Sequence, residues 1–104
     1  MRVGVMALAM AAGPAGAALA QNEGMVAAGK AVAERWCANC HVVSGAQAQG
    51  SDQAPTWSSI AARPGTTSAS LHAFLAQPHG KMPDFKLGTT DIDNVVAYIL
   101  SLKH

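Results

Sequence analysis

The sequence predicts an all-α fold of about four helices joined by long irregular loops. Apolar residues recur at helical spacing in several segments, and no segment alternates apolar and polar residues as a half-buried strand does. Ser, Gly and Gln collect between the periodic segments, which is typical of surface loops. The 104 residues suffice for one domain, and a formal net charge of +1 gives no reason to expect a nucleic-acid partner.

The N-terminus is typical of a cleavable export signal. Arg2 gives a positive start, residues 3–12 are apolar, and Ala18 and Ala20 are small residues where a signal peptidase reads the chain before Gln21. The apolar run is shorter than the roughly 20 residues that a membrane span needs, so we expect no stable span. The predicted organisation is a signal peptide over residues 1–20 and one domain over residues 21–104.

The first helix of that domain is predicted over residues 23–39. Asn22 can cap it, because its short polar side chain can accept a hydrogen bond from the first turn. Gly29 in the helix interior costs about 1 kcal/mol relative to alanine, so we expect it to admit a second helix at close range. The face expected to be buried carries Met25, Gly29, Val32, Ala33 and Trp36.

Two shorter helices are predicted in the middle of the chain. The first is expected from Thr56 or Pro55 to Ala62, and the second from Ser68 or Ser70 as N-cap to Gln77. A proline cannot continue a helix, so Pro78 ends the second. The apolar residues expected to face inward on the second are Leu71, Phe74 and Leu75.

The last helix is predicted to begin at Thr90, which forms a capping-box pattern with Asp93. Two loops, over residues 42–55 and 79–89, have no apolar period. Loops of this length in a small domain usually carry function. The inward stripe of the last helix is Ile92, Val95, Val96 and Ile99.

The most specific motif is Cys37-Ala38-Asn39-Cys40-His41. The pattern C-x-x-C-H is typical of covalent haem attachment. Each thiol would add to a vinyl group of one haem and become a thioether, and His41 would donate an imidazole nitrogen to the iron as the fifth ligand. The expected cofactor is therefore one haem c.

Two other sites compete for the same residues. Trp36-Cys37-x-x-Cys40 also resembles the redox motif of an exported thiol–disulfide oxidoreductase, but that motif normally follows a buried strand. A zinc site needs four protein ligands or an open catalytic position, and the chain has no second C-x-x-C and no H-x-x-x-H. Both alternatives stay open, with haem attachment favoured.

Four segments carry a family resemblance: Gly29-Lys30, residues 37–41, residues 81–85 and residues 96–99. Together they resemble a small bacterial class I cytochrome c over most of residues 21–104. The resemblance implies a compact helical domain around one mostly buried haem c. It also implies that the first and last helices cross near Gly29 and Tyr98.

Met82 is the expected sixth ligand, because a methionine thioether pairs with histidine in cytochromes c. It lies in the loop before the last helix, and Pro83 favours an extended backbone there. The rival ligands are His72, His79 and His104, of which His79 is the nearest to Met82 in sequence.

Three further residues are candidates for the haem environment. Pro55 resembles the family proline whose carbonyl accepts a hydrogen bond from the second nitrogen of the ligating histidine, which orients the ring. Trp57 and Phe85 are candidates to cover haem edges, and ordinary core packing is the alternative for both.

These features predict a periplasmic monohaem carrier of single electrons and no enzymatic activity, because His41 and Met82 together leave the iron no open position. The expected partners are redox proteins, such as a dehydrogenase, an oxidase or a cytochrome complex, that dock weakly at the haem edge. The alternatives are an exported thiol–disulfide oxidoreductase using Cys37 and Cys40, or a small haem subunit of a larger dehydrogenase or oxidase complex.

Overall fold

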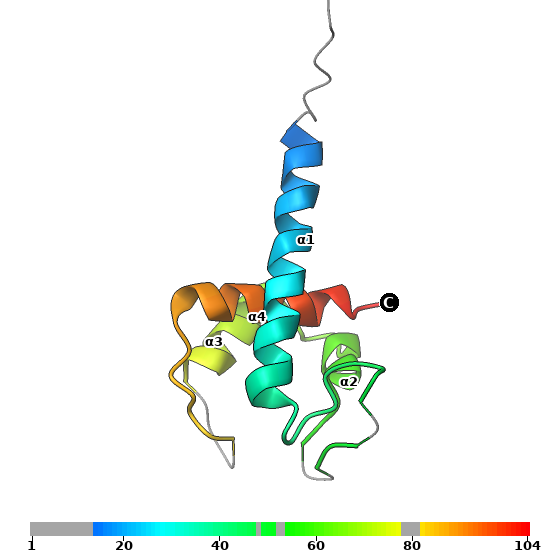
Figure 1. Cartoon of the computed structure of the whole chain (residues 1–104), viewed down its shortest axis with the longest axis vertical. Coiled ribbons are helices and arrows are strands. Elements are labelled where there is room, and N and C mark those ends of the chain that lie inside the picture. The colour runs from blue at the N-terminus through cyan, green and yellow to red at the C-terminus, as the bar shows by residue number, and fades with distance from the viewer. Residues whose placement is uncertain (1–13, 48, 52–53, 78–81) are drawn as a thin grey trace, which may run out of the picture.

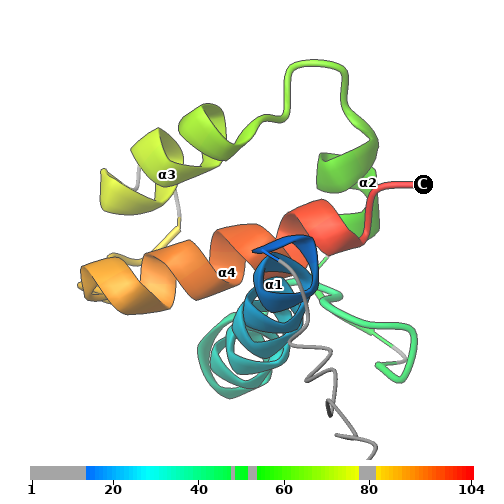
Figure 2. The ribbon, with the colours of Figure 1, turned by 90° about the horizontal axis from the view of Figure 1, so that it is seen from above.

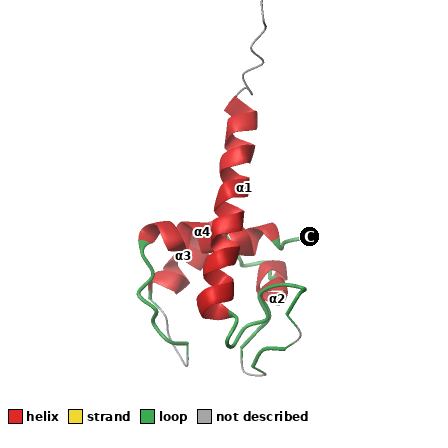
Figure 3. Ribbon diagram, viewed as in Figure 1, coloured by secondary structure: helices red, strands yellow, loops and turns green. Residues whose placement is uncertain are grey.

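The computed structural model describes residues 14–47, 49–51, 54–77 and 82–104. Within these ranges all regular structure is helical, so the predicted all-α fold is confirmed (Figure 3). Residues 1–13 of the predicted signal peptide lie outside the described ranges. The elements are α1 (Pro14–Val32), the π-helical turn η1 (Ala33–Cys37), α2 (Trp57–Ala62), α3 (Ser68–Ala76) and α4 (Thr89–Ser101).

Helix α1 begins at Pro14, well before the predicted start, and its first half projects away from the other helices (Figure 1). In the uncleaved chain Asn22 therefore lies inside α1 and is not its N-cap. Residues 15–20 are mostly alanine, the strongest helix former, and proline suits a first helical position. Among the described helices none is both long and apolar enough to cross a membrane.

The end of α1 widens into η1, where the Ala38 N–H donates to the Ala33 carbonyl at 2.9 Å, five residues back. This extra residue per turn rotates the following positions, so the buried stripe continues from Ala33 to Cys37 rather than to Trp36. Trp36 is 45% exposed, which corrects its predicted place in the core. Single π turns of this kind are frequent at functional sites.

Helices α1 and α4 cross at Gly29, as the family resemblance implied. A Cβ atom at this buried glycine would collide with the Asn94 carbonyl and would lie 3.0 Å from the Cβ of Tyr98. Figure 2, which looks along α1, shows α4 passing across it, with α2 and α3 on the other side of α4. The predicted inward stripe of α4 is confirmed as part of the core: Ile92, Val95, Val96 and Ile99.

The N-caps of the short helices are threonines. Thr56 accepts a hydrogen bond from the Ser59 N–H at 3.2 Å and caps α2. Thr67 caps α3 in place of the predicted Ser68 or Ser70, because Ser70 serves as its partner in a reciprocal capping box.

Helix α4 begins without a side-chain cap, at Thr89 after Gly88. The predicted capping box of Thr90 and Asp93 is wrong, because the Asp93 carboxylate instead lies 2.8 Å from Nε2 of His72 on α3. A contact between helices therefore replaces the local cap.

The His72 ring joins α3 to α4. Nδ1 lies 2.7 Å from the Ser68 carbonyl, while Nε2 faces Asp93 at 2.8 Å. Both nitrogens face acceptors, so the protonated ring is favoured; the Ser68 carbonyl and then the Asp93 carboxylate raise the pKa of His72 above its ordinary 6.5. Both side chains are more than one third exposed, at 39% and 44%, so water screens the pair and limits its contribution.

Replacing Gly29 with alanine should lower the free energy of unfolding by about 1–3 kcal/mol, because the new Cβ forces α1 and α4 apart. Denaturant unfolding measures the change. Gly24→Ala on the same helix is the matched control, since its Cβ meets nothing within 4 Å. It should leave stability unchanged or raise it by up to about 1 kcal/mol. Equal effects of the two variants would contradict the close crossing.

The pair between His72 and Asp93 should stabilise the fold by at most about 1 kcal/mol, and only while His72 is protonated. Because its folded pKa is raised, this contribution is complete below pH 6.5 and is lost as the pH rises through the folded pKa. Denaturant unfolding of Asp93→Asn across this window should show a deficit at low pH that disappears at high pH. Asp91→Asn, on the same helix, should give a deficit independent of pH in this range.

Candidate functional site

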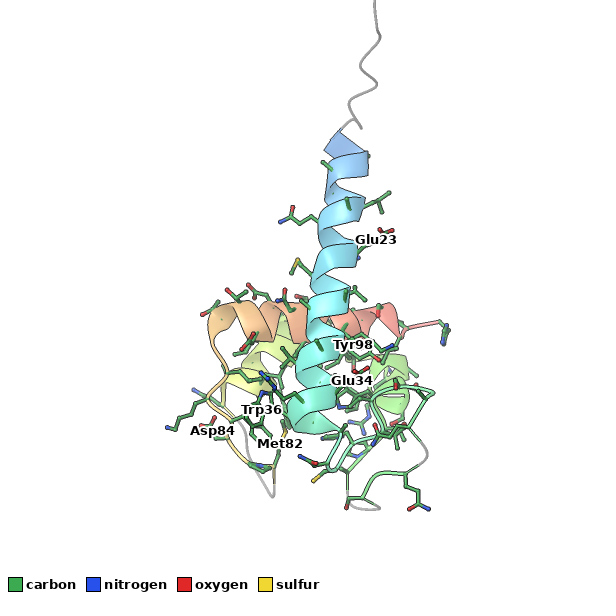
Figure 4. All side chains as sticks on the ribbon, viewed as in Figure 1. Glu23, Glu34, Trp36, Met82, Asp84 and Tyr98 are labelled. Atoms are coloured by element: carbon green, nitrogen blue, oxygen red, sulfur yellow. The ribbon has the colours of Figure 1, made fainter. Side chains whose placement is uncertain are left out.

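A largely apolar cavity of about 770 Å³ lies below the helix crossing, among η1, α2, α3 and the segment before α4. Its volume is within the range of roughly 300–1,000 Å³ that is usual for cofactor sites. Cys37, Cys40, His41 and Met82 all line it, although Met82 is distant from the others in sequence. Figure 4 shows Met82 beside Trp36 at the lower end of α1.

A tight turn at the end of η1 presents the motif to this cavity. The Cys37 carbonyl accepts hydrogen bonds from the N–H groups of Cys40 at 3.2 Å and His41 at 2.9 Å. The backbone therefore reverses within the motif, which allows both thiols and the imidazole to reach one cavity.

The imidazole of His41 is fixed by the Pro55 carbonyl, which lies 2.6 Å from Nδ1. A carbonyl can only accept, so Nδ1 carries the hydrogen and Nε2 keeps a free lone pair. This is the tautomer with which a histidine binds a metal through Nε2, and the hydrogen bond orients the ring.

Trp57 forms a buried wall behind His41. Its ring centroid lies 6.0 Å from that of His41 and 5.9 Å from that of Tyr98. The Tyr98 hydroxyl donates to the Val43 carbonyl at 2.5 Å, and the backbone N–H of Trp57 donates to the Val42 carbonyl at 3.0 Å. Helices α2 and α4 are thus tied to the chain just after the motif.

The Met82 side of the cavity carries a second aromatic pair. The rings of Phe85 and Trp36 lie 5.9 Å apart, and both residues line the cavity. Lys86 has a positive φ of 52°, which is uncommon for a residue other than glycine. Its N–H donates to Oδ1 of Asp84 at 2.8 Å, so an aspartate turn stabilises this conformation.

Two of the three rival histidine ligands lie away from the cavity. His72 is held by Asp93 and Ser68, and His104 is exposed at the chain end; neither lines the cavity. His79 lies outside the described residues. Phe74, predicted to pack inward, is 38% exposed and lines the cavity instead of the helical core.

Gln47 contacts the motif and was missed by sequence reasoning, because it lies in a polar loop without periodicity. Its side-chain amide donates to the carbonyls of Ala38 and His41 at 2.9 and 2.7 Å, and its oxygen accepts from the Val43 N–H at 3.1 Å. No pattern in the sequence marks a residue whose partners are backbone groups.

The two cysteines differ in environment. Cys37 is buried and Cys40 is exposed. Burial raises the pKa of the Cys37 thiol to about 11, which keeps it protonated at neutral pH. A thiol–disulfide enzyme needs a thiolate with a lowered pKa, and the strand that precedes such a motif is absent from residues 14–47.

A zinc site at Cys37 and Cys40 would need further ligands. In the part of the chain that the structure describes, no group of three or more His, Cys, Asp or Glu side chains gathers. By contrast, two thiols, an imidazole with a free Nε2 and a thioether around an apolar cavity fit haem c, which takes sulfur and nitrogen donors of these kinds.

Comparisons with known proteins agree with this chemistry. Residues 24–99 match the family model described as cytochrome C oxidase, cbb3-type, subunit III. The chain is 41% identical over 100 residues to cytochrome c-552 of Bradyrhizobium diazoefficiens, covering 96% of this chain and 93% of that protein. No solved structure gave a significant match. The chain therefore belongs to the cytochrome c family, as a small class I-type electron carrier with covalently bound haem c.

Proposed function

We propose that this chain is a periplasmic carrier of single electrons whose one haem is tethered by Cys37 and Cys40 and ligated by His41 and Met82. The observation that carries the proposal is that these four side chains line one cavity of sufficient volume. Haem c bound there supplies an iron that alternates between the ferric and ferrous states.

The surrounding residues support each ligand. Pro55 holds the hydrogen on Nδ1 of His41, so Nε2 is the nitrogen that binds the metal. Met82 offers a thioether, which raises the reduction potential of a His-ligated haem. Trp57 and Phe85 both line the cavity, and such apolar rings around a haem would favour the less charged ferrous state.

With His41 and Met82 both bound to it, the iron would have no open position for a substrate, which supports transport rather than catalysis. Partners such as a dehydrogenase, an oxidase or a cytochrome complex would dock briefly at the exposed rim near Met82, where Lys86 is exposed. Arg63 also lines the cavity and is a candidate partner for a haem propionate. Lys81, which directly precedes Met82 in the sequence, is a further candidate by its sequence position alone and lies outside the described residues.

Export by a signal peptide over residues 1–20 agrees with the packing of α1. Residues 17–20 are exposed, so the loss of these four residues on cleavage before Gln21 would remove little buried surface and would leave the crossing at Gly29 intact. The shortened helix would then begin close to Asn22, which could cap it.

A second candidate function is that of a haem subunit docked in a larger complex. The description of the matching family model, which names an oxidase subunit, favours it. The ligand set and the cavity would be the same in both cases.

The intact mass of the exported protein tests the covalent attachment. We expect the mass of residues 21–104 plus one haem. We also expect no reaction with alkylating reagents, because both cysteine sulfurs would be thioethers. Cys37→Ser and Cys40→Ser should each remove one thioether. A colourless protein with two reactive thiols would reject the carrier function in favour of thiol chemistry.

Replacing Met82 with alanine should open the sixth iron position and lower the reduction potential, because the thioether is lost. The reduced variant should then bind carbon monoxide, which the unmodified protein should not. Absorption spectra and voltammetry measure both effects. Met25→Ala is the matched control, because Met25 lies on α1 and does not line the cavity. Carbon monoxide binding by the unmodified protein would argue against Met82 as ligand.

A further inference from the structure

Gln47, Gly50 and Ser51 lie against the backbone of the motif at Cys40 and His41. We propose that Gln47 and Gly50 are positioning residues that fix the backbone of His41 and thereby set the strength of its hydrogen bond to Pro55. The inference rests on the proposed function, because it assumes that His41 ligates the iron. It adds two residues that touch neither the ring of His41 nor the walls of the cavity.

The Gln47 side chain bridges both sides of the motif. Its amide nitrogen lies 2.9 Å from the Ala38 carbonyl, 2.7 Å from the His41 carbonyl and 2.9 Å from the Gln49 carbonyl. An amide has only two hydrogens, so one of them is shared between two acceptors. Its oxygen accepts from the Val43 N–H at 3.1 Å, and together these four partners fix which end of the amide is nitrogen.

Gly50 brings the loop backbone into direct contact with the motif. A Cβ atom here would lie 2.6 Å from the Cys40 carbonyl oxygen and 3.0 Å from both the His41 carbonyl carbon and the Val42 nitrogen. The neighbouring Ser51 N–H donates to the same Cys40 carbonyl at 2.6 Å. No side chain fits at position 50 unless the loop moves away.

These contacts fix His41 from its main chain, while Pro55 fixes it from its ring. The carbonyls of Cys40 and His41 are both held by the loop, and the Val42 carbonyl is held by the Trp57 N–H. If the loop contacts are lost, the histidine backbone can shift and the bond from Nδ1 to Pro55 lengthens. The imidazole then becomes a weaker donor to the iron, which disfavours the ferric state and raises the reduction potential.

Gln47→Leu in the full exported holoprotein tests the first half of the inference. Leucine keeps much of the bulk but removes all four hydrogen bonds. We expect the reduction potential to rise and the Nδ1 hydrogen of His41 to exchange with solvent roughly 5- to 10-fold faster, the equivalent of about one hydrogen bond. Voltammetry and NMR measure these effects. Gln49→Leu, in the same loop and exposed, is the matched control and should change neither.

Gly50→Ala tests the second half, with Gly45→Ala as control because a Cβ at Gly45 meets nothing within 4 Å. We expect Gly50→Ala to raise the potential and the exchange rate as Gln47→Leu does. If Gln47→Leu does not accumulate, Gly50→Ala and its control Gly45→Ala still provide the two measurements. Gln47→Glu, which keeps the acceptor but not the donors, then replaces Gln47→Leu.

The outcomes separate this inference from the function on which it rests. Variants that only unfold more easily, with unchanged potential and exchange rate, would show that Gln47 and Gly50 are structural and would overturn the inference, while the ligation proposed for His41 would stand. An unmodified protein without haem, or with a haem not ligated by His41, would overturn the proposed function and the inference with it.

Discussion

The close approach of α1 and α4 at Gly29 is the contact on which the rest of the structure depends. Any side chain at this position would meet the Asn94 carbonyl, so glycine alone permits the crossing. The crossing sets Tyr98 beside α1, and from there its hydroxyl reaches the Val43 carbonyl just after the motif. Because α4 also contacts α2 and α3, the walls of the cavity are positioned by the same crossing.

The features that the sequence predicts well are those with a strong local cause. The apolar stripe of α4 is buried as its period indicates, because one face of a helix must cover the core. Gly29 is identified because an interior glycine weakens a helix unless packing requires it. Residues 37–41 are identified because thiols and imidazole at this spacing have few other uses.

The features that the sequence does not predict arise from tertiary contacts or from small energy differences. Thr67 and Ser68 are both good caps, so the choice between them depends on the reciprocal bond with Ser70. The Asp93 carboxylate contacts His72 on α3 and does not cap the N-terminus of its own helix. Trp36 leaves the core face because one π turn shifts the helical register, and no periodicity reveals such a turn in advance.

The two sides of the cavity are held by different kinds of contact, which has a consequence for their local stability. On the His41 side, hydrogen bonds join the motif to Gln47, Ser51 and Pro55. Tyr98 of α4 donates to the Val43 carbonyl just after the motif, so a local opening must break contacts between distant segments. Along residues 82–88, the hydrogen bond between Lys86 and Asp84 is local, and the ring contact of Phe85 with Trp36 is partly exposed. Segments with few buried contacts open at lower free energy than the core. The segment that carries Met82 should therefore open before the segment that carries His41. Pro55 and Gln47 keep the His41 imidazole oriented during this opening.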